Sequence, residues 1–345
     1  MSFPSQSQRT PNRGFKRRSI SQRGPLQSTE LMDAATSLYR QGGFELLRNL
    51  LIPATIAFGL LAISYHLFFS KLFSPSATES AVAQAQEVVS SMLLATTLAL
   101  PPIFLSLSYM AAFVSLYASD LHLGLRPNTL TIGTTILRKL PRLAALNFIL
   151  FLRTFIGVIF TAALLLTSAV LTDIYAGQDS IAPLLSFLGV VGIICSPIVA
   201  LFFASRDSLA PIVLMHESAG IRAALKRSQY LATARSMRRS GSFLGLVVIC
   251  IIFYFIIWLG LGIPVDYLQE FLQTQGVDTS GLLARTAYQM VASLDVFVAF
   301  LLVLPIFICG QTIIYFERRT HLEGYDIELL AQEVWKHARQ IEFDV

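Results

Sequence analysis

The chain has 345 residues, of which 54% are hydrophobic and only 14% are charged, and its formal net charge is +5. Soluble domains usually carry about a quarter charged residues. This composition therefore argues against an ordinary soluble domain and predicts a membrane protein. The three cysteines, Cys195, Cys250 and Cys309, lie in apolar stretches and have neither a disulfide pattern nor metal-site spacing.

The N-terminal residues 1–27 are rich in Ser, Gln, Pro and Gly and hold six basic residues between Arg9 and Arg23. They are predicted to form a disordered, basic cytoplasmic tail. The tail is either fully solvated or lies on anionic lipid as a polybasic segment. Residues 30–40 then have helical periodicity and predict a short amphipathic helix, which Gly42 and Gly43 would end before the first membrane span.

Six long stretches without charge follow, and their lengths suit membrane crossing because about 20 apolar helical residues span roughly 30 Å of hydrocarbon. Their apolar residues do not alternate with polar ones as the strands of a membrane barrel do. The predicted fold is an all-α integral membrane protein, with a six-helix membrane domain over 28–318 and a cytoplasmic amphipathic C-terminal helix over 319–345. The predicted spans are 49–70, 93–117, 154–172, 181–204, 242–264 and 296–316.

The basic residues predict the orientation of these spans, because cytoplasmic loops of membrane proteins carry an excess of Lys and Arg. With the N-terminus inside, all of the 26 Lys and Arg residues except Lys71 and Arg285 lie on the cytoplasmic side. We therefore expect both termini in the cytoplasm and a multi-pass protein of the cell (inner) membrane.

Residues 219–235 are predicted to form an interfacial helix whose mostly apolar face includes Ile221, Leu225 and Leu231. Its cations project elsewhere and could gather anionic phospholipid headgroups. These candidate lipid contacts are Arg222, Lys226, Arg227 and Arg235, followed by Arg238 and Arg239 just before the fifth span. The alternative is that the same charges only enforce orientation.

Several enzyme sequence motifs are matched only in part. His216 and Glu217 start like a zinc-protease helix, but the fifth position is Gly220 instead of histidine. The Ser205-Arg206 pair of membrane lipid phosphatases needs a histidine where this chain has Ile212. No catalytic residue, metal site or cofactor is predicted. The charge-free spans also disfavour ion-coupled transport, and Arg153, at an inner boundary, is expected to reach the headgroups.

Three stretches together resemble a bacterial six-span family, the membrane domain of glycerophosphoryl diester phosphodiesterase. They are 31–40, 211–231 with an Arg-Ser pair, and a closing motif that includes Arg318, Glu323, Gly324, Tyr325 and Asp326. The resemblance covers roughly 31–334 and implies a six-helix membrane fold. It implies no phosphodiesterase activity, because that chemistry belongs to a separate soluble domain for which this chain has no room.

These observations favour a non-enzymatic scaffold or accessory component that acts at the cytoplasmic leaflet. Its expected partners are membrane lipids, with anionic headgroups foremost, and other membrane proteins, but not nucleic acid. The alternative is a transporter or permease for a lipid or small solute. A polar cavity that reaches the bilayer midplane would favour transport, and a dry packed bundle would favour a scaffold.

Overall fold

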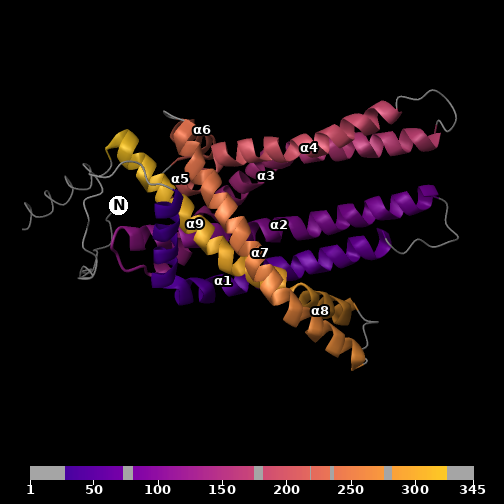
Figure 1. Cartoon of the computed structure of the whole chain (residues 1–345), viewed down its shortest axis with the longest axis horizontal. Helices are drawn as coiled ribbons and strands as arrows, with labels where there is room; N and C mark the ends of the chain where they lie inside the picture. The colour runs from indigo at the N-terminus through magenta and orange to yellow at the C-terminus, as the bar shows by residue number, and fades with distance from the viewer. Residues whose placement is uncertain are drawn as a thin grey trace, which may run out of the picture. The chain divides into compact units, whose positions relative to one another are not determined.

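The computed structural model describes residues 28–72, 81–174, 182–217, 219–233, 237–275 and 282–324, and these residues form helices joined by short connections, with no strand among them. The helices are α1 (Ser28–Leu72), α2 (Ala81–His122), α3 (Thr129–Ile174), α4 (Ala182–Asp207), α5 (Ala210–His216), α6 (Ile221–Thr233), α7 (Met237–Thr274), α8 (Leu282–Ala292) and α9 (Leu294–Glu323). Figure 1 labels each of them.

Six of the described helices are long and apolar enough to cross a membrane: α1, α2, α3, α4 joined to α5, α7 and α9. Each one overlaps a span predicted from the sequence, so the predicted all-α fold with six membrane-spanning helices is confirmed. The chain is a polytopic membrane protein. Large apolar side chains on α3, α4 and α7, such as Phe160, Ile194 and Ile256, are well exposed, as expected for helices that face lipid.

The helices fall into two compact units. Unit 1 comprises residues 1–141 and 241–345, and therefore holds α1, α2, the start of α3, most of α7, α8 and α9. Unit 2 comprises residues 142–240, with the rest of α3, α4, α5 and α6.

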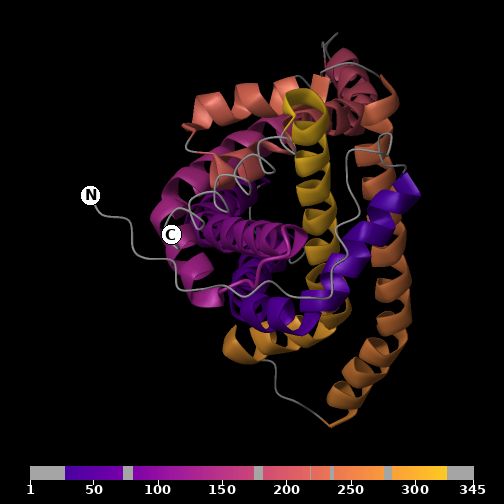
Figure 2. The ribbon, with the colours of Figure 1, turned by 90° about the vertical axis from the view of Figure 1, so that its left-hand side faces the viewer.

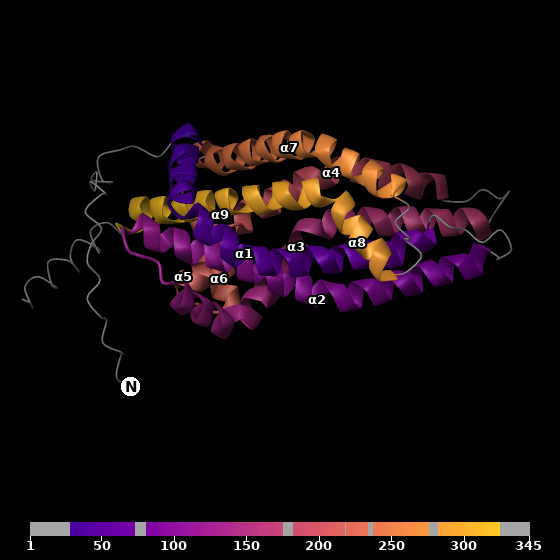
Figure 3. The same ribbon diagram turned by 90° about the horizontal axis from the view of Figure 1, so that it is seen from below.

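Unit 1 is built on α1, α2 and α9, which pack against one another. Helices α1 and α2 run side by side in Figure 1 and Figure 3. These helices contact one another where α1 begins and α2 and α9 end: the Tyr117 hydroxyl donates to Glu45 Oε2 at 2.7 Å, and the rings of His122 and Phe316 stack at 5.3 Å. Fully buried side chains of this region include Leu46, Leu50, Met110, Phe113 and Tyr315. By the predicted orientation this is the cytoplasmic end of unit 1.

The predicted break at Gly42 and Gly43 is wrong, because α1 continues as one helix from Ser28 to Leu72. Its first part runs at an angle to the rest and lies beside α9 (Figure 2 and Figure 3). Gly42 serves packing instead of termination: a Cβ placed there would collide with the ring of Tyr117. Each glycine disfavours a helix by only about 1 kcal/mol relative to alanine. Tertiary contacts therefore outweigh the low helix propensity of Gly42 and Gly43.

Local signals explain the ends of α2, α3 and α9. Gly124 has a positive φ of 72° after α2, and Asn128 Oδ1 caps α3 by accepting the backbone N–H groups of Leu130 and Thr131. Gly324, with φ 64° and ψ 36°, ends α9 in the left-handed conformation. Helix α9 continues past the predicted end of the sixth span at 316 and past the predicted start of the C-terminal helix at 319.

Candidate functional site on α6 and its polar anchor

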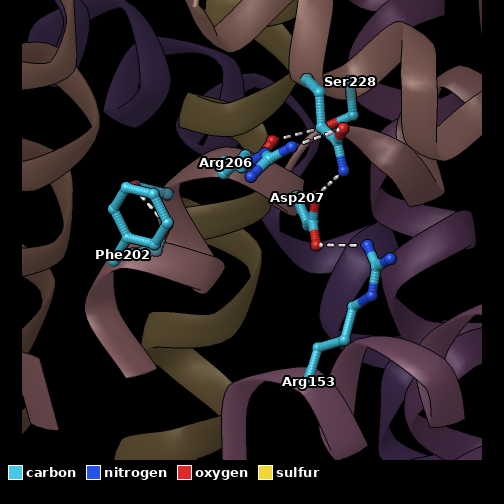
Figure 4. Close-up of polar contacts among 7 residues, drawn as sticks. Arg153, Phe202, Arg206, Asp207 and Ser228 are labelled. Atoms are coloured by element: carbon cyan, nitrogen blue, oxygen red, sulfur yellow. Dashed lines mark hydrogen bonds and ion pairs between the residues drawn. The ribbon is translucent and has the colours of Figure 1, made fainter. Parts of the chain in front are cut away.

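Asp207, the last residue of α4, is the centre of a polar cluster in unit 2 (Figure 4). Its residue surface is only 3% exposed. One carboxylate oxygen, Oδ2, accepts a hydrogen bond from Arg153 Nη1 of α3 at 3.1 Å. The other, Oδ1, accepts one from Gln229 Nε2 of α6 at 3.0 Å. Asp207 thus joins three helices of unit 2 through its two carboxylate oxygens.

Arg206 provides a second connection between α4 and α6. Its Nη2 donates to Gln229 Oε1 at 2.9 Å, and its backbone carbonyl accepts from the Ser228 hydroxyl at 3.1 Å. Gln229 therefore bridges two successive residues of α4, using its amide nitrogen for Asp207 and its amide oxygen for Arg206. Among the described residues, Arg206 Nε is buried without a hydrogen-bond partner.

The charges of this cluster explain how it tolerates burial. An isolated buried carboxylate is costly, and pairing with hydrogen-bonded cations offsets the cost. Asp207 forms an ion pair with Arg153. The side-chain amide of Gln229 hydrogen-bonds both to the Asp207 carboxylate and to the Arg206 guanidinium. We define Arg153, Arg206, Asp207, Ser228 and Gln229 as the polar anchor, because together they attach α6 to α4 and α3.

The inner face of α6 packs on α4 and α5. Ala224, Leu225, Ser228 and Leu231 are buried, which confirms the apolar face predicted from the periodicity. Protein covers this face, so it is not open to the acyl chains of a surrounding membrane. Helical spacing shows which side of a helix is apolar, but not whether lipid or protein covers that side.

The outward face of α6 carries Arg222, Lys226 and Tyr230, which lie one helical turn apart and are all exposed. We call these three residues the outer stripe. Arg227 lies beside them, with Nε 3.4 Å from the carboxylate of Glu217 and its guanidinium 6.0 Å from the centre of the Tyr230 ring. The outer stripe thus combines two cations with an amphipathic ring.

The structure brings together only part of the predicted lipid contact. Arg222, Lys226 and Arg227 share α6. Arg238 and Arg239 lie in the first turn of α7, where only the backbone is described, and Arg235 lies outside the described residues.

The predicted closing motif is also only partly described. Arg318 is buried in unit 1, while Glu323 pairs with Arg319 at 3.3 Å and Gly324 caps α9. Tyr325, Asp326 and the rest of the predicted C-terminal helix lie outside the described residues.

The polar anchor was not predicted from the sequence, although the positions of its charged residues indicate it. Arg153 directly precedes one charge-free span, and Arg206 and Asp207 directly follow the next. Consecutive spans run antiparallel, so these positions meet at the same end of a hairpin. Arg153 pairs with Asp207, while 42% of its side chain stays exposed, so its expected contact with the headgroups stays a prediction. Gln229 and Ser228 could not be foreseen, since their role depends on how α6 folds back.

Within the described ranges, no group of three His, Cys, Asp or Glu residues is placed to hold a metal ion. Comparison with known proteins finds no family, no curated protein and no solved structure that matches the chain. The resemblance to the membrane domain of glycerophosphoryl diester phosphodiesterase therefore stays a prediction.

Proposed function

We propose that the chain is a non-enzymatic scaffold or accessory component of the inner membrane, and that it acts at the cytoplasmic leaflet, where the outer stripe of α6 binds anionic phospholipid headgroups. The observation that carries this proposal is the contrast between the two faces of α6. One face is fixed to α4 by the polar anchor, while Arg222, Lys226 and Tyr230 are exposed on the other. Because the polar anchor fixes the backbone of α6, the cations of the outer stripe are already positioned before a headgroup binds. Little conformational freedom is therefore lost on binding.

Helix α6 begins only a few residues after α5, which itself continues the span formed by α4. The outer stripe therefore lies within a short distance of the membrane surface. Cations near an anionic leaflet each contribute on the order of 1 kcal/mol. Aromatic residues such as Tyr230 favour the same interfacial region.

Close packing inside unit 2 supports a scaffold over a transporter. Along α3 and α4, Gly157 lies against Ser196, Gly192 against Thr161, and the Ser186 hydroxyl donates to Ser168 at 3.0 Å. Small residues at these positions let the two backbones approach closely. The contact between these two spans is thus a packed seam instead of a wide polar passage.

Neutralising the outer stripe should lower the retention of anionic lipid. In the double variant R222Q/K226Q we expect cardiolipin and phosphatidylglycerol binding to fall by about fivefold for each lost cation, the equivalent of roughly 1 kcal/mol apiece. Native mass spectrometry of the full chain, released from nanodiscs of mixed lipid, measures the retained species. The matched variant R222K/K226R keeps both charges and should retain lipid like the parent. Equal retention in R222Q/K226Q would leave these cations with an orienting role alone.

The same preparation separates a scaffold from a lipid transporter. In proteoliposomes that contain a fluorescent phospholipid, the parent protein should leave the rate of lipid exchange between leaflets at the protein-free value. Faster exchange would contradict the proposed scaffold and support lipid transport.

The proposed orientation is tested by cysteine labelling. In a chain whose three cysteines are replaced, a cysteine at exposed Ala223 of α6 should react with an impermeant maleimide only from the cytoplasmic side. A cysteine at exposed Gln275, after α7, should react only from the outer side. The reason is the charge bias of the connecting segments. Exchanged labelling of the two positions would overturn the orientation.

A further inference from the structure

Helix α3 is far longer than a membrane crossing requires. Its 46 residues extend about 69 Å at 1.5 Å per residue, against roughly 30 Å of hydrocarbon. The predicted span begins at 154, so the first turns of α3 lie outside the hydrocarbon. Pro141 lies inside the helix and permits a bend after these turns. We call residues 129–140 the leading segment of α3; it belongs to unit 1.

The leading segment has two unlike faces. Ile132 and Ile136 are buried within the protein. On the other side Leu130 is 80% exposed and Leu137 is 61% exposed, and they lie seven residues apart on one face of the helix. Exposed arginines flank these leucines, namely Arg126, Arg138 and Arg142. Exposing both leucine side chains to water would be unfavourable, so an apolar environment for them is expected.

The same pattern recurs on α1. Phe44 is 80% exposed, and Phe44 and Leu130 are the most exposed large apolar side chains of the described residues. One turn before Phe44 lies Arg40 and one turn after it lies Arg48, and both are exposed.

Both patches border the same part of α2. Gly42, two residues before Phe44, lies against the ring of Tyr117, and a Cβ on Gly133, three residues after Leu130, would lie 3.8 Å from the Tyr109 hydroxyl. Tyr109 and Tyr117 are about 12 Å apart along the helix axis. The two patches therefore both border the last 14 residues of α2, offset by about 12 Å along its axis, on the side toward the end where α2 leaves the membrane.

We propose that these patches form a belt by which unit 1 sits in the cytoplasmic leaflet, with the apolar side chains in the upper acyl region and the guanidinium groups on anionic phosphates. The belt consists of Arg40, Phe44, Arg48, Leu130, Leu137 and Arg138. The inference rests on the proposed orientation of the chain, but not on α6, which belongs to unit 2.

Lipid fits this surface better than a protein partner does. The cations alternate with the apolar side chains on each helix, so both kinds of group can be satisfied at once only where hydrocarbon meets phosphate. Moreover, each patch continues within its own helix into a membrane span, so headgroups already lie beside it. A protein partner is the alternative that the experiment must be able to detect.

Tryptophan quenching by brominated phospholipids tests the apolar half of the belt. The two native tryptophans, Trp258 and Trp335, are first replaced by phenylalanine, and F44W, L130W or I252W is then introduced. Ile252 is 52% exposed near the middle of the predicted fifth span and serves as the deep reference. We expect quenching at 44 and 130 to be strongest with bromine near the headgroup, and at 252 with bromine near the chain end. If 252 is quenched while 44 and 130 are not, water or protein covers the belt and the proposal falls.

Anionic selectivity tests the cationic half. In the F44W protein, the relative association constant for brominated phosphatidylglycerol over brominated phosphatidylcholine should exceed one. R40Q/R48Q should lower it toward one, by at most about fivefold per lost cation, whereas R40K/R48K should leave it unchanged. Equal constants for both lipids in the F44W parent would overturn the cationic role. Lipid retention through Arg222 and Lys226 is read from separate variants, so failure of the belt and failure of the α6 site are distinguishable.

Discussion

Replacing Asp207 by alanine is expected to destabilise unit 2 by about 2–3 kcal/mol, because breaking one side of a buried ion pair leaves the other groups uncompensated. Arg153 Nη1 and Gln229 Nε2 would both lose their acceptor, and Arg206 would lose the nearby negative charge. The loss is smaller than for a fully buried pair because 42% of the Arg153 side chain is exposed.

The loss should concentrate on α6, whose connections to α4 pass through this cluster. We expect D207A to lower the midpoint of thermal unfolding in a fixed detergent and to accelerate hydrogen exchange of the α6 amides. Exchange of α1, α2 and α9, which belong to unit 1, should stay close to that of the parent.

A double variant distinguishes lost charge pairing from lost volume. R153M/D207L removes both charges together and keeps apolar bulk, so it should be more stable than D207A and close to the parent. An unchanged midpoint in D207A would show that the polar anchor does not stabilise α6. A double variant as unstable as D207A would show that packing, not pairing, is what the cluster provides.

The effect of D207A on α6 also bears on the proposed lipid binding, because the buried face of α6 is fixed by the polar anchor. If the polar anchor holds the outer stripe at the leaflet, D207A should lower anionic lipid retention even though Arg222 and Lys226 are intact. The ordering of these cations before binding would be lost, while their charge would remain.

The membrane spans could be predicted from the sequence because the constraint is local: a charge-free run of sufficient length is a property of consecutive residues. The boundaries were less predictable, since α1 begins at Ser28 and α9 continues to Glu323, in both cases on polar residues outside the charge-free runs. Gly42 illustrates the limit. Its sequence neighbour is another glycine, which suggests a break, but its spatial neighbour is Tyr117, on a different helix and far along the chain.

On α6, the exposed cations could be predicted from local sequence, but the contacts of the opposite face could not. Charge and periodicity placed Arg222 and Lys226 away from the apolar face, and both are exposed. What covers the apolar face depends on α4 and α5 folding beneath it, which no local pattern contains. The polar anchor likewise depends on the register between α4 and α6, so Gln229 has no distinguishing mark in the sequence.

Adding a single methyl group at Gly192 is expected to destabilise unit 2 by about 1–3 kcal/mol, the usual cost of overpacking a close contact. A Cβ at this position would collide with Thr161 Cγ2 of α3. Thr161 has little room to move because it is β-branched and its hydroxyl donates to the Val158 carbonyl at 2.9 Å. Glycine is thus required at 192 for α3 and α4 to approach closely.

Two further substitutions accompany G192A: G262A on α7 is the control, and T161S on α3 should restore the stability that G192A removes. A methyl group on Gly262 would meet no atom within 4 Å, so G262A should leave the unfolding midpoint unchanged or raise it slightly, since alanine is the better helix former. T161S removes Cγ2 and keeps the hydroxyl, so G192A/T161S should regain most of the lost stability. Thermal unfolding of the parent and these variants in one detergent measures the differences. If G192A and G262A behave alike, or if T161S brings no recovery, the close seam between α3 and α4 is not what Gly192 provides.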